Sequence, residues 1–343
     1  RNQLVRRVVD EAVGLGVLEP ILNDPSVSEI MINGHDTIYV ERAGKLERWP
    51  APFSSDEQLM QTIDRIVSTV NRRVDESSPM VDARLPADSR MPRGARVNVV
   101  LPPLSLNGPT VTIRLFPHAL SLTQLIERES IDRRTALLLK ACVEGRLNVV
   151  VSGGTGSGKT TLLNALSSFI NPDERIVTIE DAAELSLNQP HTIRLETRPA
   201  NVEGRGQVSI RDLVRNSLRM RPDRIIVGEC RGGEALDMLQ AMNTGHEGSL
   251  TTVHANNPDD ALSRLETLAS MSDVEVPFHA LRDQVNSAID IIVQLNRLAD
   301  GSRRVVDVSW VRSRRQEDFD LVPLMQYVID RSDPATPQGR FDV

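Results

Sequence analysis

The chain has 343 residues, enough for two domains that each bury a core of ordinary size. Apolar residues make up 40% of it and charged residues 25%, which excludes an intrinsically disordered chain. The net charge of -7 and the aromatic content of 3% argue against a nucleic-acid surface, which needs basic side chains and stacking rings. Because no apolar run approaches the roughly 20 residues of a membrane span, we expect no span of its own.

Residues 1–116 are predicted to form a smaller α+β domain at the N-terminus. An amphipathic helix is expected over Leu4–Leu22, and a second helix has its apolar face between residues 59 and 70. Short strands are expected at Val27–Ile32, Thr37–Glu41, Lys45–Arg48, Val97–Leu101 and Thr110–Phe116. Residues 117–122 follow as a linker that leads into the next helix.

Residues 123–343 change to a pattern of short β-branched strands that alternate with helices. The strands are expected at Leu147–Val151, Arg175–Ile179, Arg224–Val227 and Ser249–Val253. The helices are expected at Lys159–Phe169, Ile210–Met220, Glu234–Met242 and Pro258–Ser270. Apolar strands that alternate with helices predict a parallel α/β sheet. A closing hairpin is expected from Ile289–Leu295 and Arg304–Val311, and no chemistry is assigned to the charged tail after Arg312.

Residues 153–160, Gly-Gly-Thr-Gly-Ser-Gly-Lys-Thr, fit the phosphate-loop pattern of a glycine, four residues and Gly-Lys-Thr. The run follows a predicted strand and opens a predicted helix, which is the context that the motif requires. Glycines let backbone N–H groups converge on phosphate oxygens, and the helix N-terminus adds partial positive charge. Lys159 would reach the β- and γ-phosphates of ATP, and the Thr160 hydroxyl would bind Mg²⁺. The residues expected to contact the nucleotide are Gly154, Thr155, Gly156, Ser157, Gly158, Lys159, Thr160 and Thr161.

Nucleotide hydrolysis also needs an acid near Mg²⁺ and a group that orients or deprotonates the attacking water. Carboxylates follow directly after two predicted strands. They are Glu180, Asp181 and Glu184 after Arg175–Ile179, and Glu229 after Arg224–Val227. Open α/β sheets bind ligands at the carboxyl ends of their strands. Each carboxylate alone also fits a helix cap or a solvated loop, but together behind a phosphate loop they favour a hydrolytic site.

Two histidines bracket another predicted strand. His246 is expected to start it and His254 to end it, so His254 lies at the ligand edge. A neutral imidazole at that edge could sense the γ-phosphate through a hydrogen bond. The spacing of the two histidines does not suit zinc. Cys142 and Cys230 show no metal or disulfide spacing either, and we expect them to be buried in a protein of a reducing compartment.

These motifs, in this order, resemble the secretion ATPase superfamily that drives type II secretion, type IV pili and type IV secretion. That superfamily carries a phosphate loop, an acidic box, a Gly-Glu strand end and a histidine box, and all four are present. The runs Leu218–Ala235 and Arg96–Pro103 look most like the CpaF-type ATPases of tight-adherence (Tad, Flp) pili. The resemblance extends over nearly the whole chain.

The resemblance implies a RecA-like P-loop ATPase domain with a parallel-rich sheet, preceded by the smaller α+β domain. It implies a homo-hexamer that hydrolyses MgATP to power pilus assembly or protein secretion. Such a ring would be cytoplasmic, peripheral to the inner membrane, and would act on an inner-membrane platform protein. Glu184 takes the position of the family's catalytic glutamate, and Glu229 that of the glutamate near the Mg²⁺-bound water. Ala182 and Ala183 depart from the pattern, because relatives often carry Thr or Pro there.

In this family, arginines of the first domain close onto the phosphates. Five arginines fall in a segment whose acids are only Asp82 and Asp88; they are Arg84, Arg90, Arg93, Arg96 and Arg114. Arg96 and Arg114 lie in the best-matching stretches, and Arg84 is the third candidate. The same arginines also fit a solvated basic surface.

Two other functions share part of this pattern. A RecA-like nucleic-acid motor has the same sheet and phosphate loop, but the acidic charge, the scarce aromatics and the histidine box count against it. A scaffold that binds ATP without turnover would not need both Glu184 and Glu229. We therefore expect ATP and Mg²⁺ as ligands and no nucleic-acid partner.

Overall fold

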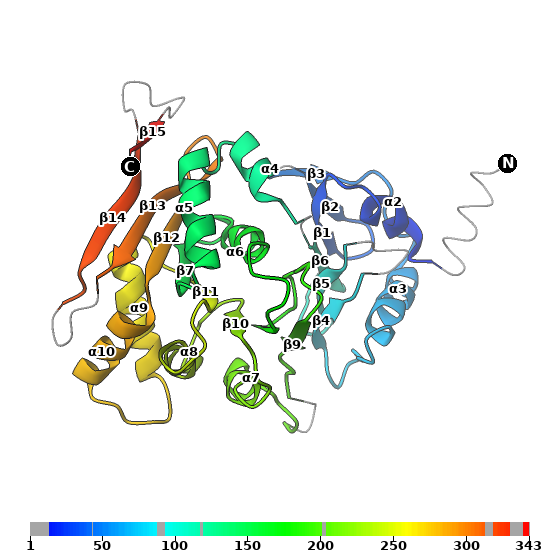
Figure 1. Ribbon diagram of the computed structural model, residues 1–343. Coiled ribbons are helices and arrows are strands. Elements are labelled where there is room, and N and C mark those ends of the chain that lie inside the picture. The colour runs from blue at the N-terminus through cyan, green and yellow to red at the C-terminus, as the bar shows by residue number, and fades with distance from the viewer. Residues whose placement is uncertain are drawn as a thin grey trace. The chain divides into compact units, whose positions relative to one another are not determined.

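The computed structural model of the protein describes residues 14–42, 44–87, 93–116, 119–200, 204–312, 318–329 and 339–342 (Figure 1). The chain divides into two compact units, Arg1–His118 and Ala119–Val343. Each unit has a sheet and buried side chains of its own. Within the described residues, no helix combines the length and the apolar content that crossing a membrane requires.

The first unit contains an antiparallel sheet of six strands in the order β3-β2-β1-β6-β5-β4. The strands are β1 (Val27–Asn33), β2 (Ile38–Arg42), β3 (Lys45–Arg48), β4 (Met80–Leu85), β5 (Ala95–Val100) and β6 (Thr110–Leu115). Side chains alternate along them, so β5 buries Ala95, Val97 and Val99 and exposes Arg96 and Asn98. One face of the sheet therefore carries the core and the other carries polar side chains.

The apolar face of this sheet packs against α3 (Asp56–Ser68). Ser55 caps that helix, because its hydroxyl accepts a hydrogen bond from the Gln58 amide at 3.3 Å. Leu59 and Ile63 then enter the same core as the buried side chains of β5. The helix expected over Leu4–Leu22 lies outside the described residues as far as residue 13, and the remainder forms a 3-10 turn, η1 (Gly16–Leu18), and α2 (Glu19–Leu22).

The second unit contains a sheet of nine strands in the order β15-β14-β13-β12-β7-β11-β10-β8-β9. The strands are β7 (Val149–Gly153), β8 (Ile176–Glu180), β9 (Thr192–Glu196), β10 (Arg224–Val227), β11 (Leu250–Val253), β12 (Ile291–Arg297), β13 (Arg303–Val311), β14 (Leu321–Ile329) and β15 (Gly339–Asp342). From β12 to β9 all neighbours are parallel, whereas β13, β14 and β15 are antiparallel. The predicted parallel α/β sheet and the closing hairpin of β12 and β13 are both confirmed.

Helices cover both faces of this second sheet (Figure 1). One layer consists of α4 (Leu122–Glu127), α5 (Arg133–Glu144) and α6 (Lys159–Ser167), and the other of α7 (Ile210–Ser217), α8 (Glu234–Asn243), α9 (Pro258–Ser270) and α10 (Phe278–Ala288). Within β7, Val149 and Val151 pack into the first layer and Val150 into the second. Strands that are buried on both faces explain why these segments read as continuous apolar runs.

Several elements are absent from the sequence prediction. They are β4, β9, β14 and β15, together with α5 and α10. The tail after Arg312, to which the sequence assigns nothing, contributes the two antiparallel strands β14 and β15 to the sheet. The outermost strands of a sheet bury little of their surface, so their sequences carry weak apolar periodicity. Here these strands are β15 and β9, and β9 has no fully buried side chain.

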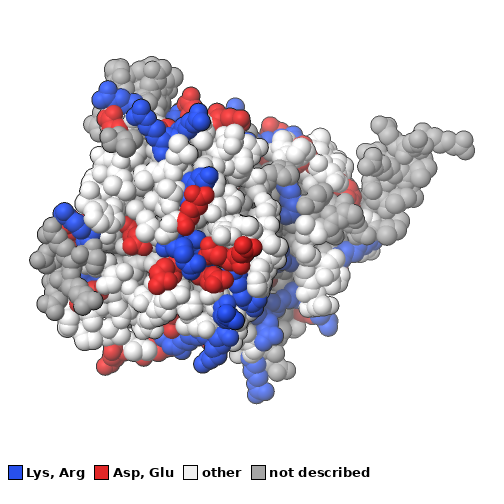
Figure 2. Space-filling model, in the orientation of Figure 1, with Lys and Arg blue, Asp and Glu red and all other residues white. Residues whose placement is uncertain are grey.

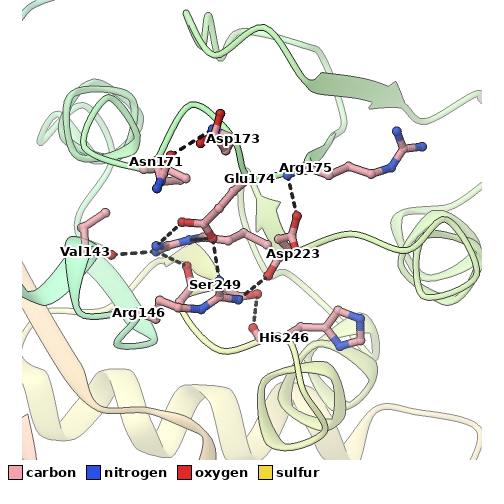
Figure 3. Close-up of polar contacts among 12 residues, drawn as sticks. Val143, Arg146, Asn171, Asp173, Glu174, Arg175, Asp223, His246 and Ser249 are labelled. Carbon is pink, nitrogen blue, oxygen red and sulfur yellow. Dashed lines mark hydrogen bonds and ion pairs between the residues drawn. The ribbon is translucent and has the colours of Figure 1, made fainter.

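A buried ion pair fixes the amino ends of the parallel strands (Figure 3). The Arg224 side chain at the start of β10 is 1% exposed, and its guanidinium donates to both carboxylate oxygens of Glu174, at 2.8 and 2.9 Å. The same guanidinium donates to the carbonyls of Val143, in the last turn of α5, and Gly248, which precedes β11. Arg146 adds a second ion pair to Glu174 at 2.9 Å. The network ties α5, β8, β10 and β11 together at the edge opposite the phosphate loop.

Replacing Glu174 with glutamine is expected to lower the free energy of unfolding by about 3–5 kcal/mol, because it leaves the buried Arg224 charge without its counter-ion. Urea titration measures the change. The matched control is Glu144→Gln, which breaks an exposed pair with Lys140 and is expected to cost less than about 1 kcal/mol. Equal losses in the two variants would contradict a structural role for the buried pair.

Candidate nucleotide site

The glycine-rich loop lies between β7 and α6, with its end at the N-terminus of the helix. Gly158 is the N-cap residue of α6 with a φ of +101°, a left-handed conformation that favours glycine. A Cβ on Gly153 would lie 2.5 Å from the carbonyl oxygen of Leu295. Only glycine therefore fits at the position where the chain leaves β7 and enters the loop. The candidate contact residues from Gly154 to Thr161 thus form the loop and the first turn of the helix.

Lys159 folds over this loop. Its Nζ donates to the carbonyl oxygens of Gly153 at 2.9 Å and Gly154 at 3.0 Å. Burial lowers the pKa of Lys159, and the Glu229 carboxylate opposes that shift. The charge on Glu229 therefore acts on the lysine of the phosphate loop.

The acidic box begins with a buried carboxyl group. Glu180, the last residue of β8, is 4% exposed. Its Oε1 accepts hydrogen bonds from the amides of Glu184 at 3.0 Å and Leu185 at 2.9 Å. Its Oε2 has no hydrogen-bond partner among the described residues. Burial raises the pKa of Glu180 to about 7, although the two amides oppose the shift.

The raised pKa of Glu180 predicts a pH dependence of stability. Between the ordinary value of 4.5 and about 7, the folded chain holds a proton that the unfolded chain has lost, so stability falls as pH rises through this window. From about pH 5 to about pH 8 the wild type should lose about 2–3 kcal/mol relative to Glu180→Gln, which does not titrate. Urea unfolding of both proteins at the two pH values measures the difference, and parallel stability curves would contradict it.

The second acid, Glu229, follows β10 after Gly228. Its carboxylate accepts from Arg231 Nε at 2.7 Å and Nη2 at 2.6 Å. Arg231 also pairs with Asp181 at 3.2 Å, which links the ends of β10 and β8. Glu234 holds this loop by accepting from the Arg231 amide at 2.6 Å. The sequence analysis did not single out Arg231. Its position two residues after Glu229 was the available signal, because residues i and i+2 of an extended chain lie on the same side.

The two histidines lie at opposite ends of the sheet. His254 follows β11 directly and is exposed, at the carboxyl edge of the strand. The expectation that His246 starts this strand is wrong, because β11 begins at Leu250. His246 lies in the preceding turn, where its carbonyl accepts from the Ser249 hydroxyl at 2.7 Å. That turn is held at the amino end of β11 by Asn148, whose Oδ1 accepts hydrogen bonds from the Gly248 and Ser249 amides.

The parallel register brings most of the sequence-predicted residues of the second unit to one edge. β7, β8, β10 and β11 run in the same direction, so their carboxyl ends share one side of the sheet. The phosphate loop follows β7, the acidic box follows β8, Glu229 follows β10, and His254 follows β11. Phosphate-binding amides, a lysine, carboxylates and an imidazole therefore converge where open α/β sheets bind ligands.

The candidate arginines of the first unit form a row across its sheet. Arg96 on β5 lies directly opposite Arg84 on β4 and Arg114 on β6. Arg96 pairs with the Asp82 carboxylate, and Arg84 lies over the Phe116 ring at 5.9 Å. Arg93 instead donates to backbone carbonyls, including that of Val27 at 2.8 Å. Arg90 lies outside the described residues.

Sequence comparisons point to one family. The family model described as "Type II/IV secretion system protein" matches residues 11–326. Over 309 residues the chain is 38% identical to a putative conjugal transfer protein of Mycobacterium tuberculosis, with 90% of this chain and 87% of that protein covered. It is 36% identical over 329 residues to the type IV secretion system protein PtlH of Bordetella pertussis, with 87% and 94% covered.

Solved structures show the same fold. The pilus retraction motor PilT with bound ADP is similar with a TM-score of 0.66 and 21% identity, over 90% of this chain and 82% of that one. The ATPase DotB of Legionella pneumophila has a TM-score of 0.59 and 22% identity, over 82% and 76%. The predicted fold class, a RecA-like α/β P-loop domain with an α+β partner, is confirmed.

Fold and site together define a P-loop ATPase. The chain belongs to the type II/IV secretion system protein family.

Proposed function

We propose that the chain is a CpaF-type motor ATPase whose homo-hexamer hydrolyses MgATP to power Tad/Flp pilus assembly or protein secretion. The carboxyl-edge arrangement of the phosphate loop, Glu184 and Glu229 carries this proposal. It is supported by relatives whose names place them in conjugal transfer and type IV secretion. The ring would be cytoplasmic, against the inner membrane, and would act on a platform protein in that membrane.

The residues of the second unit divide the work of hydrolysis. Loop amides and Lys159 bind the phosphates, and Glu184 accepts the proton of the attacking water. Thr160 and Glu229 offer a hydroxyl and a carboxylate, the oxygen donors that suit Mg²⁺. Bound Mg²⁺ neutralises charge on the phosphate oxygens. His254, at the same edge, donates a hydrogen bond that reports the γ-phosphate.

The arginine row completes the charge clamp from the first unit. Like charges directly opposite each other cost a sheet stability, so three arginines in one cross-strand row suit a surface that binds anions. Supplied across a domain or subunit boundary, Arg96 and Arg114, with Arg84 beside them, stabilise the transition-state charge only when the ring closes. Loss of the γ-phosphate then releases the closed state, and repeated closure gives a mechanical stroke.

Arg96→Ala and Arg114→Ala are expected to lower kcat by about 10³-fold or more while ATP affinity stays within a few-fold, as for arginine fingers. Steady-state turnover and nucleotide binding measure the two quantities. Arg48→Ala is the control, because Arg48 is exposed on the edge strand β3 of the same sheet. If Arg96→Ala and Arg114→Ala both turn over ATP at the wild-type rate, the first unit does not contribute to the catalytic site.

Adding DNA or RNA to the turnover assay tests the competing nucleic-acid motor. Figure 2 shows acidic side chains beside basic ones near the centre of the face in view, rather than one continuous basic surface there. We expect ATP turnover to be unchanged by either polymer. Stimulation by nucleic acid would favour the competing function, and absence of any turnover would favour a scaffold.

A further inference from the structure

Gly228 lies between β10 and Glu229, at a position where the Glu180 side chain leaves no room for a Cβ. It is not among the glycines with a positive φ, so its backbone conformation is open to other residues. A Cβ at this position would lie 2.9 Å from Cγ of Glu180 and 3.5 Å from its Cβ. Real Cβ atoms essentially never approach another heavy atom that closely, and Gly228 therefore makes the room in which the Glu180 side chain lies.

Glu180 uses that room to hold the loop that carries Glu184. Its Oε1 accepts from two consecutive amides, those of Glu184 and Leu185. The Leu185 side chain is fully buried, which anchors the far side of the loop in the core. From β9, Arg194 donates to the Ala183 carbonyl at 3.2 Å. The backbone on either side of Glu184 is thus fixed by groups outside the loop.

Gly228 also contacts the neighbouring strand β11. Thr252 on β11 donates its hydroxyl hydrogen bond to the Gly228 carbonyl at 2.7 Å. Gly228 is consequently held between Glu180 on one side and Thr252 on the other. Gly228, at the end of β10, therefore contacts the last residue of β8 and a residue of β11, so it links the strand ends that precede Glu184, Glu229 and His254.

We propose that Glu180 is a positioning residue that sets the place of Glu184 and that Gly228 is required to seat it. The proposal rests on the proposed function, in which Glu184 is the general base. Glu180 is not that base itself, because it is 4% exposed and Oε1 already accepts two amide hydrogen bonds. A displacement of about 1 Å in a catalytic group can cost about 10²-fold in rate.

A double-mutant cycle on the full chain tests the shared contact. Glu180→Ala and Gly228→Ala are each expected to lower kcat by about 10²-fold with ATP affinity unchanged. The double variant is expected to be no slower than the slower single variant, because both changes remove the same contact. Multiplicative losses would overturn the proposal. Gly145→Ala, at the end of α5 where φ is -75°, controls for adding a methyl group to a glycine.

Glu180→Gln separates the hydrogen bonds from the charge. Its amide oxygen can accept both backbone hydrogen bonds, so it is expected to recover most of the activity that Glu180→Ala loses. A glutamine variant as slow as the alanine variant would overturn a positioning role.

Amide hydrogen exchange supplies a readout that does not depend on catalysis. The Glu184 and Leu185 amides are expected to be protected in the wild type and in Glu180→Gln, and to exchange at least about 10-fold faster in Glu180→Ala. Unchanged protection in Glu180→Ala would overturn the proposal. If Glu184→Gln keeps full turnover while the exchange result holds, the assignment of the base has failed and the positioning contact stands.

Discussion

Replacing Lys159 with alanine is expected to abolish ATP turnover. The Lys159 side chain lies over the phosphate loop, within hydrogen-bond distance of the Gly153 and Gly154 carbonyls, and carries the only lysine charge at this edge of the described sheet. Removing a group that stabilises developing charge typically costs about 10²–10³-fold in rate. Here the lysine also holds the ground-state phosphates, so ATP affinity should fall together with kcat. Phosphate release and nucleotide binding measure both losses.

Lys140→Ala is the matched control for this experiment. Lys140 lies on α5 and pairs with Glu144 at 3.6 Å, away from the phosphate loop in sequence and on an exposed helix surface. We expect its turnover to equal that of the wild type. A folded Lys159→Ala protein that turns over ATP near the wild-type rate would refute the phosphate-loop assignment.

Glu184→Gln is expected to keep MgATP binding and lose most hydrolysis. The amide preserves the shape of the side chain but cannot accept a proton from water, and losses of a general base are about 10²–10⁴-fold. Single-turnover measurement with bound ATP isolates the chemical step from binding. Trapped, unhydrolysed ATP on the variant is the expected result.

Asp181→Asn provides the contrast, because Asp181 is an exposed carboxylate of the same loop that pairs with Arg231. Its turnover should fall only a few-fold, as expected for an exposed ion pair. A Glu184→Gln variant that is no slower than Asp181→Asn would transfer the role of general base to Glu229, since Glu180 is buried.

Local chemistry explains which parts of the molecule could be predicted from sequence. The strands at Val149–Gly153 and Arg224–Val227 are buried on both faces, and full burial demands the β-branched runs that make them visible. The phosphate loop is visible because its glycines, lysine and threonine must stand at fixed spacing. Once the strands are known to be parallel, the gathering of the loops at one edge follows without further information.

Features that depend on register or on distant neighbours could not be predicted. The row of Arg84, Arg96 and Arg114 exists only because β4, β5 and β6 pair in one particular register. The burial of Glu180 depends on the missing side chain of Gly228, which lies 48 positions further along the chain. The strand β15 pairs with β14 at the far edge of the sheet, where little apolar periodicity is needed.

A structure of the full chain with Mg²⁺ and a non-hydrolysable ATP analogue would show whether the carboxyl-edge residues of the second unit form the nucleotide site. We expect phosphates within the loop Gly153–Thr160, Mg²⁺ beside the Thr160 hydroxyl, and the Glu184 carboxylate facing the γ-phosphate. An analogue bound away from this loop, or a γ-phosphate that neither Glu184 nor Glu229 approaches, would contradict it.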